Sequence, residues 1–194
     1  ARALKPLRRV HLDVFGPVRW PSAQHSYVYL IGYYDEYTGY RWAFGSKTHV
    51  ASVVEEITQR LRAALRVAGL GEIEIIRSGN ASEFARAQRR HEYLADCDIF
   101  PEFSVPYSPW QIGVERGWGV AVPTAGILWQ QLSRGMPVAA TKRHWHTAVV
   151  HAFFLGNARQ STVTTIDGQP KSSSAHQRLW QRECHVAKFT AYGA

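Results

Sequence analysis

Two acidic residues at distant points of the sequence could carry chemistry, and the first of them lies among apolar neighbours. Asp13 stands in the run Val10–Phe15, and Glu115 directly follows Gly113 and Val114. A carboxylate is costly to bury, so such groups are usually paired, solvated or bound to a metal ion. Standing alone, Asp13 is most simply explained as a structural residue at a strand end.

Three segments around these acids share the sequence pattern of one family. Residues 11–17 are close to H-x-D-x-x-G-P, residues 77–84 follow R-x-D-N-x-x-E-F, and residues 106–116 are similar to P-Y-T-P-x-x-N-G-V-A-E-R. Together they resemble the retroviral-type integrase catalytic core in its copia-like LTR retrotransposon form. The resemblance covers residues 4–160 well and residues 176–193 faintly.

The resemblance implies a fold, a chemistry and a set of partners. The fold is α/β and ribonuclease-H-like, with a five-stranded mixed sheet flanked by helices. Three acids at positions 13, 79 and 115 would hold two Mg²⁺ or Mn²⁺ ions, which promote transfer of phosphodiester bonds. The implied activity is integration of element DNA into target DNA. DNA, further copies of the chain and other parts of a Pol polyprotein are the implied partners, in the nucleus or in a cytoplasmic retrotransposon particle.

The chain departs from the family pattern at two of the three acids. Gly79 stands where the second acid is expected, although 35 residues still separate it from Glu115, as the family requires. Glycine supplies no side-chain oxygen, and we predict that this copy is catalytically impaired. One residue is missing before Glu115, and Ile112 replaces an Asn. Because one residue rotates a helix by about 100°, this deletion could turn Glu115 away from the metal site.

A second interpretation comes from another functional class. The chain would be a non-catalytic DNA-binding or assembly module that keeps the integrase fold for its surface. The missing acid and the basic charge suit this interpretation equally well. Asp35, another acid near a strand, is assigned to the turn after that strand.

Candidate contacts with DNA follow from position within the resemblance. Trp110 and Gln111 lie in the loop before the third acid, and Arg116 directly follows that acid. Lys142 and Arg143 lie on a later helix. Arg86, Arg89 and Arg90 form another basic cluster. For each basic residue alone, a solvated surface charge is the competing explanation.

Composition sets limits on the class of protein. The chain has 194 residues and a formal net charge of +8, and 18 of its 23 basic residues are arginines. This balance favours a polyanionic partner, since the arginine fork suits phosphate, although a generally basic surface is the alternative. The two cysteines, Cys97 and Cys184, are too few for a disulfide framework. No apolar run approaches the roughly 18 residues of a membrane span, so we expect no membrane partner.

The elements that must position the acids follow from hydrophobic periodicity and turn residues. Strands are expected over 9–18, 26–34, 40–44, 72–77 and 99–105, and helices over 50–67, 82–96 and 137–154. A helix after Glu115 is expected to be kinked or broken, because Gly117, Gly119 and Pro123 fall within it. Residues 157–176 are polar and predict a linker or surface crossing. We divide the chain into an integrase core-like domain over 4–160 and a linker with a C-terminal extension over 161–194.

Overall fold

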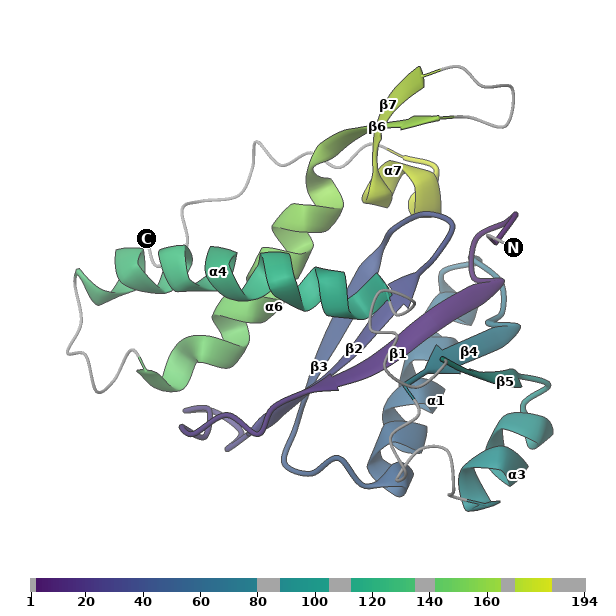
Figure 1. Cartoon of the computed structure of the whole chain (residues 1–194), viewed down its shortest axis with the longest axis horizontal. Helices are drawn as coiled ribbons and strands as arrows, with labels where there is room; N and C mark the ends of the chain where they lie inside the picture. Colours follow the sequence, from purple (N-terminus) through teal and green to yellow (C-terminus); the bar gives the residue numbers. More distant parts are fainter. Residues whose placement is uncertain (1–2, 80–87, 105–112, 135–141, 165–169, 183–194) are drawn as a thin grey trace.

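The fold is described from a computed structural model, which covers residues 3–79, 88–104, 113–134, 142–164 and 170–182. A five-stranded mixed sheet lies at its centre, in the spatial order β3-β2-β1-β4-β5 (Figure 1). The strands β1 (Arg9–Phe15), β2 (Tyr29–Asp35) and β3 (Arg41–Ser46) form an antiparallel meander. The strands β4 (Ile75–Ser78) and β5 (Phe100–Phe103) extend the sheet in parallel with β1. The expected five-stranded mixed sheet is confirmed.

Alternation along β1 separates an apolar face from a polar one. Val10 and Leu12 are fully buried in the larger core cluster. Because successive side chains of a strand point to opposite faces, Arg9, His11 and Asp13 share the other face. The strand thus contributes to the core and carries the candidate acid at the same time.

One face of the sheet is covered by α1 (Ala51–Val67). Its side chains Val54, Ile57, Leu61 and Leu65 are buried and pack in the same cluster as the apolar residues of β1. The shorter α3 (Gln88–Asp96) contacts α1 and β5. This spacing of apolar side chains at three and four residues is the pattern that predicts the helix over 50–67.

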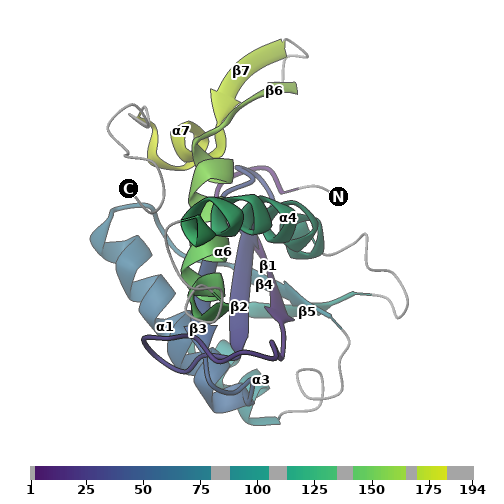
Figure 2. The same ribbon diagram turned by 90° about the vertical axis from the view of Figure 1, so that its left-hand side faces the viewer.

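The other face of the sheet is covered by two helices that cross one another. They are α4 (Gly113–Ser133) and α6 (Trp145–Ala158), which is preceded by the 3-10 helix η2 (Lys142–His144). Figures 1 and 2 show α4 running across α6 above the sheet. A second core cluster fills the space between them and contains Leu30, Val114, Trp118, Ala121, Trp145, Val149 and Phe153.

Of the kink or break expected in the helix after Glu115, the break is wrong, because α4 is continuous through Pro123. A proline cannot donate a hydrogen bond to the carbonyl four residues earlier, which here belongs to Gly119. Both residues lie on the exposed side of the helix. Water can therefore satisfy the freed carbonyl, while Val114, Trp118 and Ala121 on the opposite side are held in the core.

The polar stretch after α6 also differs from the sequence expectation. Instead of a linker, it forms an antiparallel hairpin of β6 (Gln160–Thr164) and β7 (Pro170–Ser174), followed by α7 (Ala175–Trp180). Ser174 and Gln177 close a capping box at the start of α7, and Leu179 is buried in the larger core. The guanidinium of Arg178 donates to the carbonyls of Thr38 and Ser173, at 2.8 and 2.7 Å. These contacts bind the extension to the turn between β2 and β3.

The remaining boundaries differ from the expectations by a few residues. The helix expected over 137–154 begins as η2 at Lys142 and ends at Ala158, while 137–141 lie outside the described residues. The first part of the helix expected over 82–96 also lies outside them. The resemblance predicts a short β segment over 179–193, but Leu179 and Trp180 belong to α7, and residues 183–194 lie outside the described residues. In the part of the chain that the structure describes, no helix is long and apolar enough to cross a membrane.

Candidate active site

Asp13 lies on β1, at the point where three elements meet. Its backbone pairs with Gly32 of β2, and Trp118 of α4 donates its indole N–H to Asp13 Oδ2 at 3.0 Å. Burial raises the pKa of Asp13, whereas the backbone N–H of Val14 and the indole of Trp118 lower it. The net shift is upward, so the desolvation of this carboxylate is only partly compensated by its two donors.

Trp118 reaches Asp13 because β2 has no side chain at position 32. A Cβ built on Gly32 would lie 2.3 Å from Cζ2 of Trp118, closer than any van der Waals contact allows. The indole ring also stacks on Phe153, with ring centroids 4.8 Å apart. Sequence reasoning missed Trp118 as a partner of the acid. Gly32, which interrupts the apolar and aromatic residues of β2, was the available signal, because such a glycine often marks a close approach.

Glu115 lies in the first turn of α4, within electrostatic range of Asp13. Burial raises the pKa of Glu115, and the negative charge of Asp13 raises it further. The two carboxylates are therefore close enough to repel each other in a partly desolvated site. Although the sequence around Glu115 is one residue shorter than the family pattern, the charge of Asp13 still acts on Glu115 in the first turn of α4.

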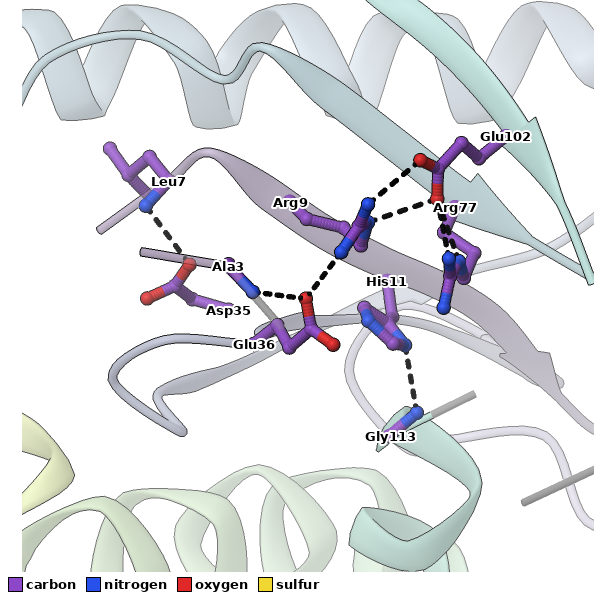
Figure 3. Close-up of polar contacts among 9 residues, drawn as sticks. All are labelled: Ala3, Leu7, Arg9, His11, Asp35, Glu36, Arg77, Glu102 and Gly113. Carbon is purple, nitrogen blue, oxygen red and sulfur yellow. Dashed lines mark hydrogen bonds and ion pairs between the residues drawn. The ribbon is translucent and has the colours of Figure 1, made fainter. Parts of the chain in front are cut away.

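That helix start is fixed by His11. The backbone N–H of Gly113 donates to His11 Nδ1 at 2.9 Å (Figure 3). His11 is only 3% exposed, and burial lowers its pKa to about 4. The imidazole is therefore neutral at neutral pH and accepts one of the N–H groups that a helix start leaves unpaired. A Cβ on Gly113 would lie 2.3 Å from the ring of Tyr34, so only glycine fits between His11 and that ring.

The other acids near this sheet face are already paired with arginine. Figure 3 shows Glu102 of β5 between Arg9 and Arg77, with Arg9 reaching Glu36 as well. Burial raises the pKa of Glu102, but the hydrogen bonds and charges of the two arginines hold it below its usual value. These ion pairs tie β1, β4 and β5 together. Glu36 and Glu102 therefore have a structural role, as partners in these ion pairs.

Gly79 directly follows β4, whose last residue, Ser78, pairs with Leu12. Because the two strands are parallel and neighbours, this register places position 79 next to Asp13, at a strand spacing of about 4.8 Å. An acid here would lie beside the first one, but glycine offers no ligand. The described residues include no group of three His, Cys, Asp or Glu that could hold a metal ion. Asp13 and Glu115 fit part of one divalent site and do not fit a two-ion centre.

The residues predicted to contact DNA do not form one cluster in the described part of the chain. Arg116 is exposed on α4 beside Glu115. Lys142 and Arg143 lie on η2, against the loop that joins β1 to β2, and are not brought to the carboxylates. Trp110, Gln111 and Arg86 lie outside the described residues, as do the side chains of Arg89 and Arg90.

Asp35 has the turn role that the sequence predicts. It is fully buried and accepts hydrogen bonds from the backbone N–H groups of Leu7 and Thr38 and from the Thr38 hydroxyl. Burial raises its pKa, and these donors lower it. Asp35 therefore joins the N-terminal segment to the turn after β2.

Comparisons with known proteins place this fold among viral integrases. No protein-family model and no curated protein matches the chain. A chain of the simian T-cell lymphotropic virus intasome, solved in complex with PP2A regulatory subunit B56 gamma, matches with a TM-score of 0.64 and 19% identity, over 96% of this chain and 58% of that one. The HTLV-2 integrase catalytic core in complex with magnesium matches with a TM-score of 0.58 in two forms. Identity is 19% for the trimeric form, over 92% of this chain and 99% of that one, and 18% for the dimeric form, over 91% and 99%. The fold is therefore the ribonuclease-H-like α/β fold of integrase catalytic cores.

Proposed function

We propose that this chain is the DNA integration domain of a copia-like LTR retrotransposon polyprotein, and that it has lost one of its metal-binding acids. The convergence of Asp13 and Glu115 on an integrase-like fold carries the proposal. The sequence patterns around both acids, which are 102 positions apart in the chain, support it independently. In this proposal the substrate is DNA, and the reaction class is metal-dependent polynucleotidyl transfer.

The chain's own residues would prepare a partial site for one divalent ion, Mg²⁺ or Mn²⁺. Such an ion supplies charge stabilisation for the phosphate oxygens of a phosphodiester. Asp13 and Glu115 would bind it, Trp118 would orient Asp13, and His11 would fix the start of the helix that carries Glu115. Without an acid at position 79 the ligand set is incomplete. We therefore expect the unmodified chain to bind DNA and to catalyse little or no strand transfer.

Restoring the missing acid is the direct test. Gly79→Asp should produce a rise in melting temperature on addition of Mn²⁺ or Mg²⁺, because a ligand that binds only the folded state stabilises it. The same variant should gain metal-dependent cleavage or joining of duplex oligonucleotides. The matched control is Gly79→Asp combined with Asp13→Asn, which should lose both effects. A Gly79→Asp chain that folds, binds no DNA and shows no response to metal would overturn the proposal. Strand transfer by the unmodified chain would overturn the expected impairment.

A non-catalytic DNA-binding or assembly module remains the second candidate function. Gly79 itself favours it, since the loss of a ligand is harmless to a protein that works through its surface. A metal titration of the unmodified chain separates the two candidates. Residual binding that disappears in Asp13→Asn supports a former catalytic site, whereas no binding by either chain supports the surface module.

The wider setting is also part of the proposal. We propose a homo-oligomer, and the HTLV-2 cores of similar fold were solved in trimeric and dimeric forms. Other parts of the Pol polyprotein are proposed partners, in the nucleus or in a cytoplasmic particle. The division into a core-like domain over 4–160 and an extension over 161–194 remains a prediction.

A further inference from the structure

A basic surface lies apart from the two carboxylates, where the loop between β1 and β2 meets η2. This surface, the Trp20 surface, consists of Arg19, Trp20, Lys142 and Arg143. The Arg19 guanidinium lies 5.1 Å and the Lys142 ammonium 5.3 Å from the centroid of the Trp20 ring. Trp20 is 42% exposed, and Arg19 and Arg143 are also exposed. An indole ring thus holds two cations together at the protein surface.

The loop is fixed in this position by hydrogen bonds between distant segments. The indole N–H of Trp145, which is buried at the start of α6, donates to the Trp20 carbonyl at 2.6 Å. The backbone N–H of Ala23 donates to the carbonyl of Arg143 at 2.9 Å. The Ser22 hydroxyl accepts from the N–H of Tyr27 within the loop. The cations are therefore held on an ordered scaffold, which reduces the entropy lost when they bind a ligand.

Nothing nearby in sequence neutralises these cations. Residues 16–28 and 142–158 contain no Asp or Glu. The acids Glu36, Glu72, Glu74 and Glu102 pair with other basic residues near the amino end of β1 and around β4. Among the described residues, no ion pair involves Arg19, Lys142 or Arg143. Cations gathered without counter-charges repel one another, and a polyanion relieves that repulsion.

The Trp20 surface lies within reach of DNA that contacts the carboxylates. Arg19 follows Asp13 by six residues, and an extended chain covers at most about 3.6 Å per residue. The two residues are therefore separated by at most about 22 Å, which is less than one turn of duplex DNA, about 34 Å. A duplex that passes Asp13 and Glu115 can place the phosphates of the same turn on the Trp20 surface.

We infer that the Trp20 surface binds the phosphate backbone of duplex DNA and supports it beyond the candidate active site. The inference rests on the proposed function, since it takes DNA as the ligand. Sequence reasoning proposed Lys142 and Arg143 as separate contacts. The structure adds Arg19 and Trp20, and makes the four residues one surface. The contact is independent of DNA sequence, because phosphates carry no base information.

The test measures the affinity of the whole chain for a fluorescent 30-base-pair duplex across a series of salt concentrations. Replacing Arg19, Lys142 and Arg143 together with Gln should weaken binding and reduce the slope of log K against log salt by about 2.7, at about 0.9 for each phosphate that is no longer neutralised. Trp20→Ala keeps the net charge and should weaken binding about three-fold, because the ring no longer holds the two cations.

The matched control replaces Arg8, Arg60 and Arg159 with Gln. These three are exposed: Arg8 precedes β1, Arg60 lies in α1 and Arg159 follows α6, and the control has the same net charge as the test variant. Circular dichroism and thermal melting show whether each variant folds. If the test and control variants lose affinity and slope equally, the Trp20 surface is not the binding site, although the proposed function stands. If the unmodified chain binds no duplex even at low salt, the proposed function fails together with this inference.

Discussion

The buried imidazole of His11 makes the stability of the fold depend on pH in a defined window. In the unfolded chain the pKa of this group is near its ordinary value of 6.5, and in the folded protein burial lowers it to about 4. Between pH 6.5 and about pH 4, His11 is therefore protonated in the unfolded state but largely neutral in the folded state. The contribution of neutral His11 to the free energy of unfolding is fully present above pH 6.5, and it is lost as the pH falls towards 4.

The magnitude follows from the two pKa values. At pH 5 the unfolded imidazole is almost fully protonated and the folded one is largely neutral, which lowers the free energy of unfolding by about 2 kcal/mol. The full difference between the two pKa values corresponds to roughly 3 kcal/mol well below pH 4. Because the imidazole accepts the Gly113 N–H, its protonation also releases the start of α4, which carries Glu115.

Urea unfolding followed by tryptophan fluorescence measures this effect between pH 7.5 and pH 5. The comparison is with His11→Asn, whose side-chain oxygen can accept the Gly113 N–H but does not titrate. The wild-type chain should lose about 2 kcal/mol more than the variant over this range. His25→Asn removes an exposed imidazole and keeps the buried one, so it should follow the wild-type chain. Parallel curves for the wild type and His11→Asn would refute the assignment of His11 as a neutral helix cap.

Further predictions concern the packing around the site. Gly119→Ala should stabilise the chain by up to about 1 kcal/mol in urea unfolding, because this exposed helical glycine has no atom within 4 Å of a new Cβ. Gly32→Ala should instead cost about 3 kcal/mol or more, because its Cβ would overlap Trp118, and a variant of wild-type stability would contradict that packing. Trp118→Phe should raise the pKa of Asp13 in an NMR titration, since the ionised form then has one donor fewer. Arg178→Ala should speed hydrogen exchange in β6 and β7, and unchanged protection there would show that the guanidinium does not hold the hairpin.

Much of the fold could be predicted because it is encoded in local patterns. The apolar spacing of Val54, Ile57 and Leu61 predicts α1, and the alternation in β1 predicts a strand with one buried face. The turn role of Asp35 is equally local, since an acidic residue before a glycine-containing turn commonly accepts backbone hydrogen bonds.

Two features could not be predicted, the continuity of α4 and the β6–β7 hairpin, because tertiary contacts override local preference. The sequence favours a break at Pro123, but Val114, Trp118 and Ala121 are buried in one cluster, and the affected carbonyl faces solvent. The strands β6 and β7 are rich in Ser and Thr and show no apolar alternation. Their pairing depends in part on Arg178, which belongs to a later helix.

The sequence predicts the acids of the candidate site but not the residues that support them. Asp13 and Glu115 follow from sequence patterns, and the structure brings them together. His11 and Trp118 contact partners about one hundred residues away, Gly113 and Asp13 respectively. Such contacts between residues distant in sequence cannot be found from spacing alone.

The glycine at position 79 has a consequence for how such a chain evolves. The carboxylates of Asp13 and Glu115 already repel each other, and a third acid beside Asp13 would add to that repulsion whenever no cation is bound. A site with three such acids would therefore lose stability in return for metal binding, as active sites often do. Under the proposed function, Gly79 removes this conflict, so that selection for folding alone would preserve the glycine where catalysis is not required.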